Sequence, residues 1–286
     1  MSETRRVAWA LVAFARSDPL AATGASLLVL LVFVSAIGPL LPIGDPTQIG
    51  VGPRLSAPTA DWPLGTDELG RSNLPRIVEA INATFLLACT AVLLTAAIGI
   101  VAGMAAGYAG GWLDMLVMRL ADVLFSFPPL LLAIFMAAIL GSGAGAAITA
   151  IVLVTLPLFV RVVRAVTLSV VERGFVVAAE VSGASARRIL FMHVLPNVAG
   201  AAIIQLTYAL SVGMLVESAL SFLGLGVQPP GASLGSLLRQ GAVYMIIAPW
   251  LVFPAAGILV LAIMSVNLLG DGLRDLLDPL GGRALT

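Results

Sequence analysis

Long apolar runs separated by short polar stretches dominate this sequence. A membrane-spanning helix needs about 20 apolar residues. Five stretches of sufficient length carry no charged side chain, namely those between Asp18 and Asp45, Glu79 and Asp114, Asp122 and Arg161, Arg188 and Glu217, and Arg239 and Asp271. The glycine-rich residues 141–145 divide the stretch that follows Asp122 into two. The pattern therefore predicts an all-α integral membrane protein with six transmembrane helices.

The apolar runs also give approximate limits for these helices. Pro128 and Pro129 are expected to kink the third span or to begin its buried part, because proline lacks a backbone N–H. Gly99, Gly103 and Gly107 recur every four residues in the second span, which predicts close packing against another helix. The other spans are expected at about 20–41, 80–108, 145–163, 198–219 and 249–269, and the third span is expected to continue to Leu140. A solvated loop is expected at 42–79, and a short helix near 234–243.

An amphipathic stretch, residues 175–197, lies between the fourth and fifth spans. Ser169 and Glu172 have capping-box spacing, which predicts a helix that begins just after Ser169. Gly183 interrupts the helical pattern, Ser185 can cap a second helix, and Pro196 is expected to end the unit. Residues at steps of three and four predict one face formed by Phe175, Ala179, Ser182, Ala186 and Ile189. Two short helices joined at a glycine favour a docking surface, although an ordinary surface helix has the same periodicity.

Arginine is unevenly divided between the two sides of the predicted membrane. With six spans, both termini and the loops 109–118 and 164–197 share one side. The cytoplasmic side of a membrane protein is enriched in basic residues, so we expect the termini and this loop in the cytoplasm. That side holds eleven arginines and the other holds four: Arg5, Arg6, Arg16, Arg119, Arg161, Arg164, Arg173, Arg187, Arg188, Arg274 and Arg283, against Arg54, Arg71, Arg76 and Arg239.

Composition narrows the possible chemistry. Of the 286 residues, 60% are hydrophobic and 10% are charged, against about 25% charged in a soluble domain. The net charge is zero, which gives no indication of nucleic-acid binding. The chain has no lysine and so cannot contain the Gly-Lys-Ser/Thr loop that holds nucleotide phosphates, which leaves any ATP chemistry to another subunit. The lone cysteine, Cys89, lies in an apolar run and is expected to be a small core residue. For His193, the single histidine, we expect first a structural or docking contact, second a pH-sensitive role, and least of all a role as metal ligand.

The amphipathic stretch resembles the EAA loop of ABC importer permeases. Ala178 and Ala179 fill the two alanine places, Gly183 fills the glycine place, and Leu195 and Pro196 fill the end. Val177 replaces the first Glu of that pattern, and His193 occupies its Ile place. The histidine form is similar to the dipeptide, oligopeptide and nickel branch. Further segments match that branch in order: Gly65–Arg71 with Ser72 in place of a final Asp, Gly107–Asp114, Arg119–Asp122 as an expected i,i+3 pair, Ser221–Pro230 and Gly270–Pro279.

The resemblance implies a type I ABC importer permease of the bacterial inner membrane with cytoplasmic termini. Residues 1–79 would form the N-terminal tail, the first span and an external loop, 80–271 the permease domain, and 272–286 a cytoplasmic tail. The coupling loop, about 170–196, would meet the ATPase and would act as a lever between ATP hydrolysis and the spans. Its implied contact residues are Ala178, Ala179, Glu180, Ser182, Gly183, Ala184, Ala186, Arg187, His193 and Pro196.

The implied partners are a second homologous permease in a heterodimer, two cytoplasmic ATPase subunits or one fused ATPase, an extracytoplasmic solute-binding protein and membrane lipids, with no nucleic acid. ATP and Mg²⁺ would bind to the ATPases, which leaves this chain non-catalytic and without a cofactor of its own. The implied solutes are di- and oligopeptides, with nickel, glutathione or another small solute as alternatives. The translocation path would involve Gln205, Tyr208, Ser211 and Glu217, although each can equally bond between helices.

Other classes of membrane protein remain rivals. An ion-coupled secondary transporter requires an inverted repeat or ionisable groups within the membrane. The sequence shows no repeat, and among ionisable residues only Glu217 falls near a span, at its expected outer end. A channel would need a filter-like segment, and a membrane enzyme would need clustered histidines or carboxylates. Neither pattern is present.

Overall fold

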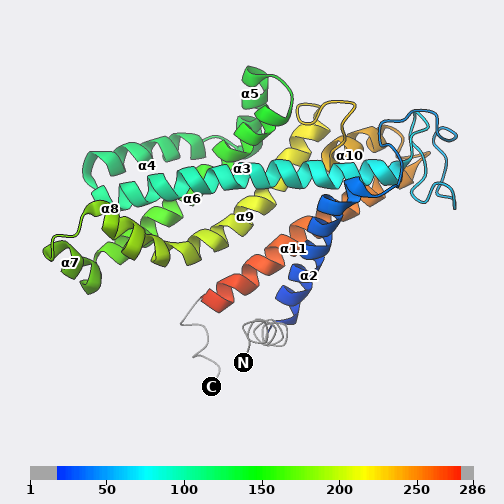
Figure 1. The fold of residues 1–286 in the computed structure, drawn as a ribbon. Coiled ribbons are helices and arrows are strands. Elements are labelled where there is room, and N and C mark those ends of the chain that lie inside the picture. Colours follow the sequence, from blue (N-terminus) through cyan, green and yellow to red (C-terminus); the bar gives the residue numbers. More distant parts are fainter. Residues whose placement is uncertain (1–17, 278–286) are drawn as a thin grey trace, which may run out of the picture. The chain divides into compact units, whose positions relative to one another are not determined.

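The structure is a computed structural model that describes residues 18–277 (Figure 1). Arg5, Arg6, Arg16, Arg283 and the last two residues of the Gly270–Pro279 match lie outside this range. Within it the chain is helical, and its one β-bridge, between Thr66 and Ser72, is isolated. The elements are α2 (Pro19–Ile37), η1 (Gly38–Leu40), α3 (Asn73–Ala109), α4 (Gly111–Phe125), α5 (Pro129–Leu140), α6 (Ala144–Val171), α7 (Gly174–Val181), α8 (Ala186–Ile189), η2 (Leu190–Val194), α9 (Leu195–Phe222), α10 (Leu234–Val243), η3 (Pro249–Leu251) and α11 (Phe253–Leu277).

Five helical stretches among residues 18–277 are long and apolar enough to cross a membrane, and α4 with α5 makes a sixth if the pair is one broken span. The two helices of this pair are bent by 93°. Pro128 disfavours a helical residue before it, and Pro129 begins the new helix, so the expected proline kink is confirmed. The all-α architecture and the short helix at 234–243 are also confirmed.

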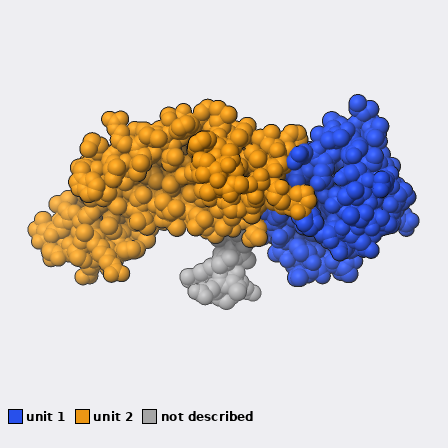
Figure 2. Space-filling model, turned by 90° about the horizontal axis from the view of Figure 1, so that it is seen from above, with its two compact units in different colours: residues 1–85, 230–286 blue, residues 86–229 orange. Residues whose placement is uncertain are grey.

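The chain divides into two compact units (Figure 2). Unit 1 contains residues 1–85 and 230–286, and unit 2 contains residues 86–229. Within unit 1, α2 packs along α11 (Figure 1). Helix α3 begins in unit 1 and ends in unit 2.

Glycines give α3 and α6 a close approach within unit 2. A β-carbon on Gly99 would lie 2.5 Å from the Phe159 ring, and one on Gly103 would lie 2.6 Å from Val163. One on Gly107 would lie 2.8 Å from Thr167. Because no side chain fits in these gaps, the predicted small-residue face on the second span is confirmed, and α6 is the helix that packs against it.

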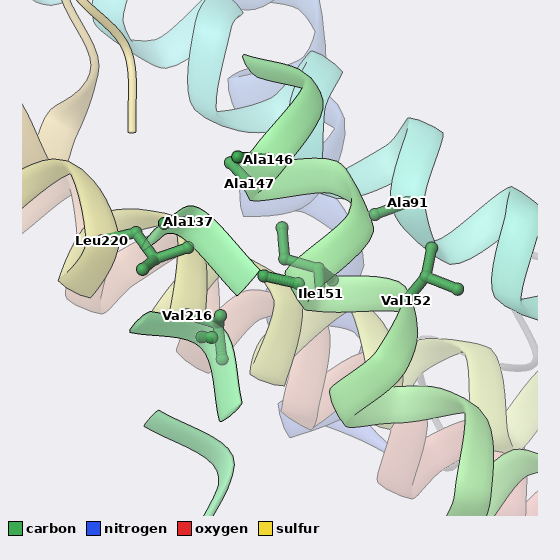
Figure 3. Packing of buried hydrophobic residues seen from close by; sticks show 10 residues of the cluster. Ala91, Ala137, Ala146, Ala147, Ile151, Val152, Val216 and Leu220 are labelled. Carbon is green, nitrogen blue, oxygen red and sulfur yellow. The ribbon is translucent and has the colours of Figure 1, made fainter. Parts of the chain in front are cut away.

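Two apolar clusters hold unit 2 together. The first joins α3, α5, the start of α6 and the end of α9, and includes Ala91, Ala137, Ile151, Val216 and Leu220 (Figure 3). The second cluster contains side chains of α3, α6 and α9 together with residues of α7, α8 and η2. One side of the amphipathic stretch is therefore anchored in a core.

Candidate functional site

The first helix of the amphipathic stretch begins later than the capping-box spacing predicted. Helix α6 continues through Val171, and the Ser169 hydroxyl donates to the carbonyl of Val166 at 2.8 Å, within the last turns of that helix. The predicted helix start after Ser169 is therefore wrong. The break falls at Arg173, whose backbone is extended, and α7 begins at Gly174. We call residues 174–197 the coupling segment, after the coupling loop that the sequence resemblance implied here.

Gly183 makes the turn between the two short helices of this segment. Its φ is +79°, in the left-handed region that favours glycine, and a β-carbon there would meet nothing within 4 Å. The Gly183 N–H donates to the carbonyl of Glu180 at 2.9 Å, and that of Ala184 donates to Ala179 at 3.0 Å. Ser185 then caps α8 by accepting from the Arg188 N–H, as predicted. Glycine is therefore favoured at position 183 by the backbone conformation, and not by a lack of room for a side chain.

The helix does not end at Pro196, which corrects the prediction. Helix α8, the π-helical segment η2 and α9 form one continuous helical stretch, Ala186–Phe222. A proline inside an α-helix clashes with the carbonyl four residues earlier, and a π turn, with its wider i to i+5 bonding, gives the ring room. The Asn197 side chain donates to the carbonyl of His193 at 2.7 Å, which satisfies an acceptor near this irregular turn.

Three residues anchor the coupling segment in the second cluster. Val176 of α7, Ile189 of α8 and Val194 of η2 are completely buried there. They share this cluster with Phe159, Val163 and Val170 of α6, Val198 and Ala202 of α9, and Ala96 and Met104 of α3. The segment therefore packs against α6, α9 and the part of α3 that lies in unit 2.

The predicted single face does not form, because the turn at Gly183 rotates α8 relative to α7. Ile189 is buried and Ala179 is partly buried against the cluster, whereas Phe175, Ser182 and Ala186 are exposed. Ala184 also packs against the cluster, and the ring of His193 lies 6.0 Å from that of Phe175. The candidate contact residues that remain on the surface are Ala178, Glu180, Ser182, Gly183, Ala186, Arg187 and Pro196.

A shallow hollow of about 390 Å³ lies beside this surface and is lined by Ser185, Arg187, Arg188 and Phe191. Its two arginines are exposed, so the segment presents positive charge next to small side chains. Small residues allow close approach of another protein, and exposed guanidinium groups suit carboxylates on that protein.

Arginines of α6 bind carboxylates of α4. Arg164 makes two hydrogen bonds to Asp114, and Arg161 donates to Asp122 at 2.6 Å. Arg161 also lies 4.6 Å from the centre of the Phe125 ring. The predicted pair of Arg119 with Asp122 is replaced by this contact between two helices, which fastens α4 to α6.

The sequence pattern of one protein family matches residues 99–280 of this chain. That family is described as the binding-protein-dependent transport system inner membrane component. The chain belongs to this family. It is therefore a multi-pass permease subunit of an ABC importer in the bacterial inner membrane, as the sequence resemblance implied.

Individual members of this permease family are similar over most of their length. The dipeptide transport system permease protein DppC of Alkalihalophilus pseudofirmus is 37% identical over 92% of this chain and 87% of the relative. The di/tripeptide permease DppC of Pseudomonas aeruginosa is 37% identical over 90% and 86%. The glutathione transport system permease protein GsiD of Pectobacterium atrosepticum is 38% identical over 82% and 76%.

A solved structure shares the permease fold. A chain of the inward-facing MetNI methionine ABC transporter superposes with a TM-score of 0.55 and 19% identity, over 71% of this chain and 95% of the other. At this identity the likeness concerns the fold alone.

The four residues expected to line the translocation path do not form one exposed surface. Tyr208 is exposed on α9 and Gln205 is half-buried, whereas Ser211 and Glu217 are buried within unit 2. Glu217 accepts from the Ser221 hydroxyl at 2.7 Å and from Ser218 at 3.3 Å. These bonds favour a structural role for Glu217. Among residues 18–277, no three His, Cys, Asp or Glu side chains are grouped to hold a metal ion.

Sequence reasoning identified the Gly65–Arg71 motif but missed what it does. Asp67 is buried and accepts from Arg71 Nε at 2.7 Å and from Arg76 Nη1. Arg76, at the start of α3, also donates to the Gln240 side chain of α10 at 2.8 Å. The motif is thus a buried ionic clamp that holds the loop 41–72 to α3 and α10. Gln240 is 164 residues from Arg76, so spacing along the chain gave no signal for this contact.

Proposed function

We propose that this permease pairs with a second, different permease to form the path along which an ABC importer moves di- and oligopeptides into the cell. The relatives named as dipeptide and di/tripeptide permeases support peptides as the solute. A second candidate is glutathione, itself a tripeptide, which the similarity to GsiD supports.

The observation that carries the mechanism is the anchoring of the coupling segment. Its outer surface presents small residues and Arg187, and its inner surface is fixed through Val176, Ile189 and Val194. We propose that the ATPase receives the outer surface in a groove. When the ATPases close on ATP, the segment moves as a rigid lever and tilts α3, α6 and α9, since proteins with close-packed cores move as blocks.

ATP and a loaded solute-binding protein must each favour one orientation of the path, because a ligand shifts an equilibrium only through its different affinity for the two states. Hydrolysis and Mg²⁺ binding belong to two ATPase subunits or one fused ATPase, and solute capture belongs to the binding protein. This chain contributes the path and the lever and catalyses no reaction.

The domain limits follow from this assignment. Residues 1–79 form the tail, first span and external loop, 80–271 the permease domain, and 272–286 the cytoplasmic tail. The uneven distribution of arginine supports placing the coupling segment in the cytoplasm and the loop 41–72 outside.

Reconstitution into proteoliposomes tests the proposal. We expect ATP-dependent uptake of a radiolabelled dipeptide with both permeases, the ATPases and the binding protein. Omission of the second permease should abolish uptake, and this chain alone should hydrolyse no ATP. Unlabelled dipeptide and glutathione, added as competitors, distinguish the two solutes. Uptake without the second permease, or uptake driven by an ion gradient without ATP, would contradict the proposal.

A further inference from the structure

Residues 243–247 lead from the last residue of α10 toward η3, and four of them have large, exposed apolar side chains. Val243, Ile246 and Ile247 are 75%, 97% and 62% exposed, and Met245 is half-exposed. Single exposed aliphatic residues are ordinary, but a contiguous group of them marks an interaction surface. We call residues 243–247 the apolar turn.

The base of the apolar turn is firmly held within unit 1. The Leu234 N–H at the start of α10 donates to the Thr84 hydroxyl at 3.1 Å, and Gln240 accepts from Arg76 at 2.8 Å. A β-carbon on Gly241 would come within 3.1 Å of the Leu251 side chain. Because α10 is fixed to both α3 and η3, the turn projects from a rigid base.

The backbone of the turn is bonded internally. The N–H of Tyr244 donates to Gly241 at 3.0 Å, that of Ile247 to Tyr244 at 3.0 Å, and that of Ala248 to Tyr244 at 2.7 Å. In hydrocarbon no water is present to satisfy such groups, so a segment that enters lipid must pair them itself. The apolar turn meets much of this requirement.

We propose that the apolar turn inserts into the membrane, just below the headgroups of the leaflet that faces the loop 41–72. The turn directly precedes the span Pro249–Leu277, and so lies where the chain enters the bilayer. No charged residue occurs after Arg239 until Asp271. Phe253, the first residue of α11, is also an exposed apolar residue.

The residues beside the turn fit the bilayer boundary. Arg239 is exposed on α10 and carries a guanidinium group suited to lipid phosphate. Tyr244, which is partly exposed, is an aromatic residue of the kind enriched at headgroup depth. A protein interface has about one hydrogen bond per 100–200 Å², whereas the side chains of Val243, Met245, Ile246 and Ile247 have no hydrogen-bond donor. These features favour lipid over a protein partner as the occupant.

Insertion would hold the outer end of α11 and the ionic clamp at a constant depth while other helices tilt. This inference depends on the family assignment and on membrane insertion, and not on the coupling segment. Its failure would therefore leave the proposed coupling site untouched.

Fluorescence quenching in nanodiscs tests the inference on the complete transporter. Cys89 is first replaced by alanine and the cysteines of the partner subunits are removed. An environment-sensitive fluorophore is then attached at Ile246→Cys, with Ile49→Cys as the matched control. Ile49 is an isoleucine of the loop 41–72 and is 64% exposed.

We expect the label at 246 to be blue-shifted, to be quenched by lipids with a spin label near the headgroup, and to be protected from aqueous iodide. The label at 49 should show the reverse. Quenching of the 246 label by iodide as strongly as the 49 label would overturn the inference. So would protection from both quenchers, since that result places the turn against another subunit.

Discussion

Gly183 and Asp67 occupy their motif positions for two different physical reasons. Gly183 has open space around it, and its positive φ is what an ordinary side chain resists. Asp67 is required by its partners, because it is buried between two arginine side chains. The sequence drew attention to both residues, but only the backbone angle and the ion pairs explain them.

Replacement of Gly183 should loosen the turn between α7 and α8 in proportion to the cost of its left-handed backbone. We expect Gly183→Ala to cost about 1–2 kcal/mol and Gly183→Asn to cost less, because asparagine tolerates this conformation. Hydrogen exchange of the amides around the turn should rise about 5–30-fold in the alanine variant. Equal exchange in the two variants would show that backbone conformation is not the reason for glycine here.

Asp67→Asn should destabilise the loop 41–72 strongly, because it leaves the buried Arg76 guanidinium without a carboxylate. The loss of one partner from a buried ion pair costs about 3–5 kcal/mol. Glu68→Gln is the matched control, since Glu68 is more exposed and lies 3.7 Å from Arg71. That variant should cost no more than about 1 kcal/mol. Thermal unfolding of the purified transporter, with proteolysis of the loop as a second measurement, compares them. Similar losses in both variants would rule out the ionic clamp.

At the scale of elements, charge gaps predicted the helices well and local spacing predicted their junctions poorly. The spans were recognised because a bilayer demands long uncharged runs. Helix α6 continues to Val171, beyond Arg161 and Arg164, because a charged residue ends an uncharged run without ending a helix. The π turn before Pro196 was missed for a related reason, since sequence rules treat proline as a helix end while tertiary packing keeps the helix continuous.

The surface of the coupling segment was predicted only in part. The glycine turn and the Ser185 cap are local features and were recognised. Which residues face the core depends on the rotation at Gly183 and on α6, so the burial of Ile189 did not follow from periodicity. Long-range contacts such as Arg76 with Gln240 and Arg161 with Asp122 likewise could not be predicted from the sequence, because only the fold brings these residues together.

The anchoring of α7 makes a specific prediction about coupling. Val176→Ala should cost about 2 kcal/mol through lost apolar burial and the cavity it leaves. Val152→Ala is the matched control, because Val152 is buried in the other cluster of unit 2 (Figure 3). Both variants should unfold at lower temperature, but only Val176→Ala should lower the amount of solute transported per ATP hydrolysed. An equal loss of coupling in Val152→Ala would show that any core damage has this effect.

At the scale of the whole molecule, the family and the all-α fold agree with the sequence resemblance. The side of the membrane on which each loop lies rests on the distribution of arginine. The mechanism requires the coupling segment to face the ATPase and the loop 41–72 to face away from it. Orientation and docking can therefore be tested together.

Site-specific photocross-linking in the complete transporter is the most direct test. A photoreactive amino acid replaces Val181, which is 85% exposed at the end of α7, or Ile49, which is 64% exposed in the loop 41–72. We predict a cross-link from position 181 to an ATPase subunit and none from position 49 to any ATPase. A transporter that is active in uptake, yet forms no ATPase cross-link from position 181 or forms one from position 49, would contradict the assignment of residues 174–197 as the coupling segment.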